Sequence, residues 1–88
     1  MYSFNQFLLD TCWKNFGENV LVRDEGGSLG SASGDFEACQ TICDENPGCN
    51  AFARHADATC HLKDKKFDGS EETYSKPPYT FYYRVCGE

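Results

Sequence analysis

The chain has 88 residues, 40% of them hydrophobic, and its 14 acidic and 8 basic residues give a net charge of −6. A chain this short cannot divide its apolar residues between two cores, so residues 1–88 are interpreted as a single domain. The negative charge would repel phosphate backbones and sulfated glycans, so no nucleic acid is expected among the partners. The one basic cluster is interpreted as a solvated loop and consists of Lys63, Lys65 and Lys66.

The six cysteines are an even number and are dense for a chain of this length. This composition favours disulfide pairing in an oxidising compartment, so we expect a secreted, extracellular protein. Residues 1–10 lack the basic start of a signal peptide, and Asn5 and Gln6 interrupt their apolar stretch. No apolar run approaches membrane-spanning length, so no membrane insertion is expected. We therefore expect a domain excised from a longer multidomain secreted protein.

In chain order, the first extended segments are expected within residues 11–16 and 20–23. Residues 26–34 are rich in glycine and serine, which predicts a loop or an irregular edge. A helix is then predicted from Asp35 to Glu45, because Asp35 can cap its start and Pro47 disfavours its continuation. Its apolar positions recur at spacings of three and four and form one buried stripe: Phe36, Cys39, Ile42 and Cys43.

Three further strands are predicted at residues 50–54, 59–63 and 80–86, the first two joined by a polar turn. Residues 68–78 are expected to be mobile. The sum is an α+β fold in which one helix lies on an antiparallel sheet. Alternation along the last strand places Phe81 and Tyr83 on one face and Tyr82 and Arg84 on the other.

Cys39 and Cys43 stand one helical turn apart and project toward the sheet, so each can fasten the helix to a later element. Cys43 can reach Cys49 across the turn at residues 46–48. In this proposal Cys39 would pair with Cys60 on the second central strand, which leaves Cys12 and Cys86 to join the two ends of the chain. This is one of the fifteen connectivities that six cysteines allow.

The spacing Cys39-x3-Cys43-x5-Cys49 continues into the segments 50–52 (Asn-Ala-Phe) and 59–63 (Thr-Cys-His-Leu-Lys), with Cys12 and Cys86 outside them. Together these motifs closely resemble the PAN/apple domain over residues 12–86, the expected core of the module. The resemblance implies the same three disulfides, that between Cys12 and Cys86 being typical of the apple subset.

Apple domains occur in tandem in plasma prekallikrein and its coagulation-factor relative, and in micronemal adhesins that coccidian parasites secrete to attach to host cells. The acidic composition favours the micronemal kind. The resemblance therefore implies one of several tandem modules in a secreted adhesin, stored in a secretory organelle such as the microneme before release. Its partners would be proteins or carbohydrates on a cell surface, together with the neighbouring domains of its own chain.

A zinc site is the main competing interpretation, since Cys39-x3-Cys43 followed by His55-x5-His61 matches a two-plus-two ligand spacing. It would leave the intervening cysteines as free thiols, so we expect no metal and interpret the histidines as structural. Residues 24–26 and 44–46 are acidic but do not continue into the spacing of a calcium loop. No metal or other cofactor is expected.

Catalysis is not expected either. A nucleophile needs a positioned base and a third group that orients it, and two histidines with scattered carboxylates do not suggest such a set. Residues 30–34 (Gly-Ser-Ala-Ser-Gly) superficially resemble a nucleophile elbow, but alanine occupies the central position. The chain is therefore predicted not to be an enzyme.

With metal binding and catalysis not expected, the function left to consider is the recognition of a ligand by surface residues. The candidates for ligand binding are amphipathic side chains near the two ends of the chain: Trp13, Tyr79, Tyr82, Tyr83 and Arg84. Most of these rings are expected in the core, because so small a domain needs its large side chains inside. A lectin should show a concave site with Asp, Asn or Arg, and a protein-docking module, as in a protease zymogen, a flatter apolar patch. A structural spacer repeat should show neither.

Overall fold

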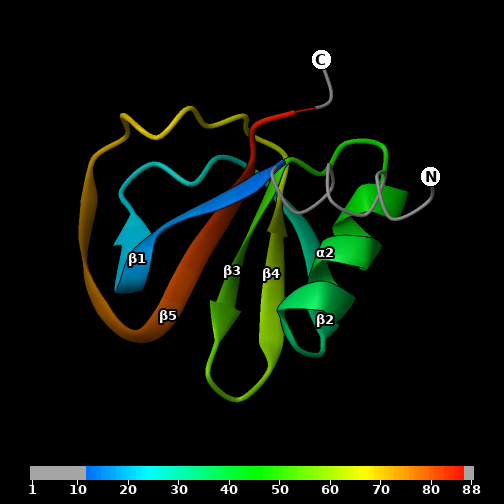
Figure 1. Cartoon of the computed structure of the whole chain (residues 1–88), viewed down its shortest axis with the longest axis horizontal. Coiled ribbons are helices and arrows are strands. Elements are labelled where there is room, and N and C mark those ends of the chain that lie inside the picture. Colours follow the sequence, from blue (N-terminus) through cyan, green and yellow to red (C-terminus); the bar gives the residue numbers. More distant parts are fainter. Residues whose placement is uncertain (1–11, 87–88) are drawn as a thin grey trace, which may run out of the picture.

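An antiparallel sheet of five strands with one helix packed against it makes up residues 12–86, the part of the chain that the computed structural model describes (Figure 1). The strand order is β1-β5-β3-β4-β2, and every neighbouring pair is antiparallel. This arrangement confirms the predicted α+β fold. The elements in chain order are β1 (Trp13–Val22), β2 (Ser28–Ser33), α2 (Phe36–Glu45), β3 (Ala51–His55), β4 (Thr59–Lys63) and β5 (Thr73–Arg84).

Helix α2 begins and ends where the sequence predicts. The Asp35 carboxylate accepts a hydrogen bond of 2.9 Å from the backbone N–H of Ala38, so one of the unpaired amides of the first turn is satisfied. At the other end Asn46 has extended backbone angles, and Pro47 follows it. The buried face of the helix carries Cys39 and Cys43.

Of the two alternatives predicted for residues 26–34, a loop or an irregular edge, Ser28–Ser33 follow the second, because they form the edge strand β2. The outer edge of β4 offers free backbone groups, and a glycine- and serine-rich segment can pair with them without large side chains to bury. Ala32 lies opposite Cys60 in this pairing, and the register shifts between Ser28 and Gly30. Gly30 has a φ of 110°, which glycine adopts without strain. The segment is thus an irregular edge strand.

The expectation of a mobile segment at residues 68–78 is wrong for its second half, because residues 73–78 belong to β5 and residues 73–75 pair with β1. The two segments expected near the start of the chain are likewise one strand, β1. Pro77 and Pro78 have no N–H to donate, and the register of the two strands shifts opposite them, between Glu18 and Val20. Only Asn19 of β1 lies between these two residues, whereas β5 has residues 76–79 there, so the extra residues of β5 form a bulge that contains the prolines, and pairing resumes at Ser75.

The sheet buries a cluster of apolar residues on each face. Between the sheet and α2 lie Trp13, Cys39, Cys43, Cys49, Phe52, Cys60 and Leu62. The opposite face buries Leu21, Val22, Ala51, Ala53, Phe67, Phe81 and Tyr83. Phe81 and Tyr83 thus share one face of β5, while Tyr82 packs against the helix-side cluster, as the alternation predicts.

Three disulfides join the elements: Cys39 to Cys60, Cys43 to Cys49, and Cys12 to Cys86. These are the pairs expected from the helix spacing. The first fastens α2 to β4, and the second fastens the end of α2 to the turn that follows it. The third joins the residue before β1 to the second residue after β5. All six cysteines are consumed, which is consistent with an oxidising, extracellular setting.

Candidate functional site

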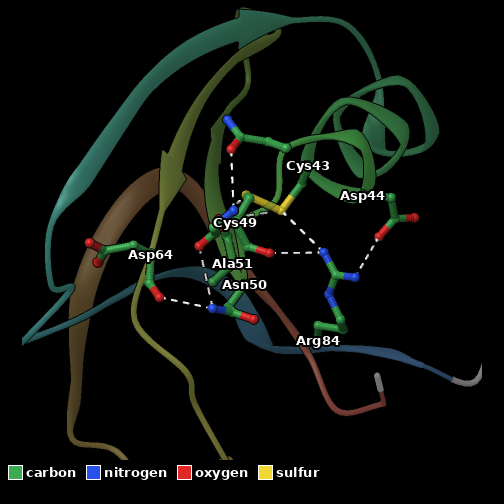
Figure 2. The surroundings of a disulfide bond; sticks show 9 residues. Cys43, Asp44, Cys49, Asn50, Ala51, Asp64 and Arg84 are labelled. Carbon is green, nitrogen blue, oxygen red and sulfur yellow. Dashed lines mark hydrogen bonds and ion pairs between the residues drawn. A yellow bond between two sulfur atoms is a disulfide. The ribbon is translucent and has the colours of Figure 1, made fainter. Parts of the chain in front are cut away.

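A polar pocket of about 370 Å³ lies where the end of α2 meets the end of β5. Its lining comes from Asp44, the turn at residues 46–50, the loop at residues 66–68, and residues 84–86. We name this cavity the Arg84 pocket. Figure 2 shows part of its lining around the disulfide between Cys43 and Cys49. The polar groups come from four separate segments that the disulfides and the sheet bring together.

Arg84 connects the elements around this pocket. One guanidinium nitrogen lies 3.1 Å from the Asp44 carboxylate, and another donates a hydrogen bond of 2.9 Å to the carbonyl oxygen of Cys49 (Figure 2). The guanidinium carbon lies 5.3 Å from the centre of the Trp13 ring, a cation–π distance. Only 22% of the Arg84 side chain is exposed. The arginine therefore holds the end of α2, the 46–50 turn and β5 in one fixed arrangement.

Asp44 has competing influences on its charge. Partial burial raises the pKa of its carboxyl, while the charge of Arg84 and a hydrogen bond from Trp13 lower that pKa. The net direction is upward. Asp44 is thus a partly desolvated carboxylate that depends on Arg84 for its charge compensation.

The turn between α2 and β3 is held in place from both sides. The disulfide between Cys43 and Cys49 ties the turn back to the last part of the helix. At its end, the side-chain amide of Asn50 donates a hydrogen bond of 2.9 Å to the carbonyl oxygen of Asp64. The backbone carbonyl of Asn50 accepts a hydrogen bond of 3.0 Å from the backbone N–H of Arg84. This wall of the pocket is consequently rigid before any ligand arrives.

Two exposed charged residues, Lys66 and Asp68, also line the pocket. Lys63 and Lys65 are paired with Glu25 and Asp24, but Lys66 has no ion pair within residues 12–86. Hydrogen bonds from Ser70 lower the pKa of the Asp68 carboxyl.

Of the five predicted ligand-binding residues, only Arg84 lines the pocket. Trp13 and Tyr83 are 8% and 5% exposed, so their rings offer little surface to a ligand. The half-buried Tyr82 ring packs on Phe36 at 4.5 Å. Tyr79 lies on the face away from α2, next to His55 at 4.9 Å and His61 at 6.3 Å. The structure therefore does not gather these five side chains into one site.

Sequence reasoning missed the other polar residues of the pocket. The acidic segment 44–46 was considered as a calcium loop, whose spacing it lacks, and the lysine cluster was interpreted as a solvated loop. The available signal was their position: Asp44 follows Cys43, and Asn50 follows Cys49. A polar residue next to a buried disulfide is held at a fixed place on the surface. That local rule could have marked Asp44 and Asn50, but not Lys66 or Asp68.

The zinc site considered as the competing interpretation does not match the state of the cysteines. Cys39 and Cys43 are both in disulfides, so neither can supply a thiolate ligand. Within the described residues, no three His, Cys, Asp or Glu side chains are grouped so as to hold a metal ion.

No helix in residues 12–86 is long and apolar enough to cross a membrane.

The fold and the pocket define a class of protein: a small disulfide-linked α+β domain with a preformed polar pocket. No protein-family model matches the chain, and neither the curated proteins nor the solved structures contain a significant match. The function must therefore be argued from the residues of the fold and of the pocket.

Proposed function

We propose that the chain is a non-catalytic extracellular recognition module of the PAN/apple kind, and that it binds a neutral saccharide in the Arg84 pocket. In this proposal it is one of several tandem modules in a secreted, micronemal-type adhesin used for host-cell attachment. The cysteine spacing supports the family, and the three disulfides support the extracellular setting.

The observation that carries the proposed ligand class is the polar lining of a pocket of suitable size. Its volume of about 370 Å³ falls within the range of small-molecule sites. Sugar hydroxyls both donate and accept hydrogen bonds, so they can pair with carboxylates, amides and cationic groups together. The lining offers all three kinds. Its two acidic residues, Asp44 and Asp68, balance its two basic residues, Lys66 and Arg84, which favours a ligand without net charge.

Rigidity supports recognition as the role of this pocket. Arg84 is held by Asp44 and by the Cys49 carbonyl, and a disulfide fixes the adjacent turn. A ligand that enters a preformed site does not have to order loose side chains, so more of its interaction energy appears as affinity. At the outer side of the pocket, the exposed Asp68 carboxylate accepts hydrogen bonds of 2.9 Å and 2.7 Å from the backbone N–H and the hydroxyl of Ser70, whereas the exposed Lys66 has no ion pair within residues 12–86.

The same lining supports a non-catalytic role. Its two cysteines, Cys49 and Cys86, are in disulfides and cannot act as nucleophiles. Asp44 is engaged with Arg84. The residues present are suited to holding a ligand by hydrogen bonds.

A glycan-array screen tests the proposal. The oxidised domain should be displayed multivalently, so that weak binding at single sites is amplified by avidity. We expect reproducible binding to a defined neutral saccharide, competition by the free sugar, and loss of binding in Lys66→Ala and Asp68→Asn. Lys76→Ala is the matched control, because Lys76 is exposed but lies on β5 away from the pocket.

A folded domain that binds no glycan would contradict the saccharide proposal and favour a protein partner or a spacer role. Binding that survives in the Lys66→Ala and Asp68→Asn variants would place the ligand outside the Arg84 pocket.

A further inference from the structure

The three disulfides differ in how far solvent reaches them. Cys39, Cys43 and Cys60 are completely buried and Cys49 is 2% exposed, whereas Cys12 and Cys86 are both half-buried. Thiol–disulfide exchange requires a thiolate to reach one of the two sulfur atoms. Of the three disulfides, the bond between Cys12 and Cys86 is therefore the one most open to a reductant in the folded protein, while the other two are shielded by the core.

The accessible disulfide is also part of the Arg84 pocket. Val85 and Cys86 form one side of the cavity, and they follow the end of β5 at Arg84. Beyond the strand, this wall is tied to the rest of the domain by the bond to Cys12 and by a hydrogen bond of 2.7 Å from the Val85 N–H to the Cys12 carbonyl. Reduction of the disulfide would leave only the hydrogen bond of these two connections.

The fold does not depend on that bond alone. Immediately inside it, β1 and β5 pair through Trp13 with Arg84 and Lys14 with Tyr83, and the ladder continues to Val22. The disulfide between Cys39 and Cys60 still fastens α2 to β4. The disulfide between Cys43 and Cys49 still fixes the opposite wall of the pocket. Reduction at the chain ends should accordingly loosen residues 85 and 86 and leave the sheet intact.

We propose that the disulfide between Cys12 and Cys86 is a redox-labile bond, and that its reduction by a dithiol loosens the Val85–Cys86 wall and weakens ligand binding in the Arg84 pocket. The effect on binding rests on the proposed function, whereas the selective reduction does not. The chemistry is a two-electron exchange. One reductant thiolate attacks a sulfur and forms a mixed disulfide, and the released cysteine thiolate takes up a proton. The second reductant thiol, deprotonated, then displaces the other cysteine and closes the reductant's own disulfide.

Differential alkylation measures the selectivity. The folded, oxidised domain is treated with increasing dithiothreitol, the thiols are trapped with iodoacetamide, and the labelled cysteines are identified by mass spectrometry. We expect Cys12 and Cys86 to be labelled before any of the other four. Labelling of Cys39, Cys43, Cys49 or Cys60 at the same reductant concentration would overturn the proposal.

Amide NMR spectra of the same partly reduced sample measure the consequence for the pocket. We expect shifts concentrated at residues 84–86 and at the adjoining 46–50 turn, with the amides of β3 and β4 unchanged. Shifts throughout the sheet would mean that reduction unfolds the domain, and would refute a local effect.

The double variant Cys12→Ser with Cys86→Ser mimics the reduced state. For a saccharide found on the array, we expect its dissociation constant to rise by about tenfold. An unchanged constant in a folded double variant would refute the coupling to the pocket. If no saccharide binds the oxidised domain, the proposed function fails, while the labelling order and the NMR shifts still decide whether this bond is redox-labile.

Discussion

Replacing Arg84 by methionine would remove the guanidinium group and keep an unbranched apolar side chain in its place. Two interactions disappear in Arg84→Met: the ion pair to Asp44 at 3.1 Å and the hydrogen bond to the Cys49 carbonyl at 2.9 Å. The carboxylate of Asp44 is only 29% exposed, so water replaces its lost partner incompletely. The cation–π contact with Trp13 is lost as well.

The expected loss in the free energy of unfolding can be worked out from the types of contact that Arg84→Met removes. A hydrogen bond from a charged donor contributes about 1.5–3 kcal/mol. The ion pair is partly exposed, so its own contribution is discounted to about 1 kcal/mol or less. Since such contributions are not fully additive, we expect Arg84→Met to lower the free energy of unfolding by about 2–3 kcal/mol. That is a large share of the stability of a small domain.

Urea denaturation of the oxidised protein, followed by tryptophan fluorescence, measures this loss. Arg23→Met is the matched control, because Arg23 forms a surface pair with Glu72 in which the side chains are 60% and 76% exposed. Its loss should cost about 0.5 kcal/mol or less. If Arg84→Met is no more destabilising than Arg23→Met, then Arg84 does not hold the pocket together and the argument from rigidity is wrong.

Two further predictions concern the helix and its last turn. Replacing Cys39 and Cys60 together by alanine should lower the free energy of unfolding by about 2–5 kcal/mol, and an unchanged unfolding midpoint would refute the role of this disulfide as a staple. Folding raises the pKa of the Asp44 carboxyl above its ordinary value of 3.8, so the folded state binds the proton of Asp44 more tightly than the unfolded state does. The contribution of Asp44 to the free energy of unfolding therefore declines as the pH rises above 3.8. Asp44→Asn should therefore gain stability relative to the wild type between about pH 3 and pH 6. Urea unfolding across that range checks the sign, and a relative loss would contradict it.

The sequence predicted those parts of the fold that depend on local patterns. Asp35 and Pro47 bound the helix because a cap and a proline act on their own neighbours. Cys39 and Cys43 indicated which helix face meets the sheet, because the spacing of four residues is a property of the helix itself. Strands β3 and β4 could also be predicted from short local patterns: β3 begins with three consecutive apolar residues, Ala51 to Ala53, and apolar and polar residues alternate in β4.

Elements that depend on distant partners could not be predicted in this way. Strand β2 has two apolar residues among its six, Leu29 and Ala32, too few for a strand pattern, and it forms by pairing with the edge of β4. The first half of β5 contains Pro77 and Pro78, which ordinarily argue against a strand, and it pairs with β1 because the prolines lie in a bulge of β5, after which the pairing resumes at Ser75.

The candidate site was hardest to predict, because it is made by residues from four segments. Arg84 was predicted as a ligand-binding residue on the same strand face as Tyr82, but the sequence did not indicate that it lines the pocket through contacts with Asp44 and the Cys49 carbonyl. Those contacts join residues that are 40 and 35 positions apart in the chain (84 − 44 and 84 − 49). No local pattern connects them, and only the folded sheet and the disulfide after α2 bring them together.

The central claim is that the Arg84 pocket binds a neutral saccharide, and an NMR titration tests it most directly. The ¹⁵N-labelled, oxidised domain is titrated with a panel of neutral mono- and disaccharides. We predict saturable chemical-shift changes for at least one sugar, at the backbone amides of Asn50, Lys66, Asp68 and Arg84. Shifts that instead centre on Tyr79 and His55, on the face away from α2, or no shifts with any sugar, would contradict it.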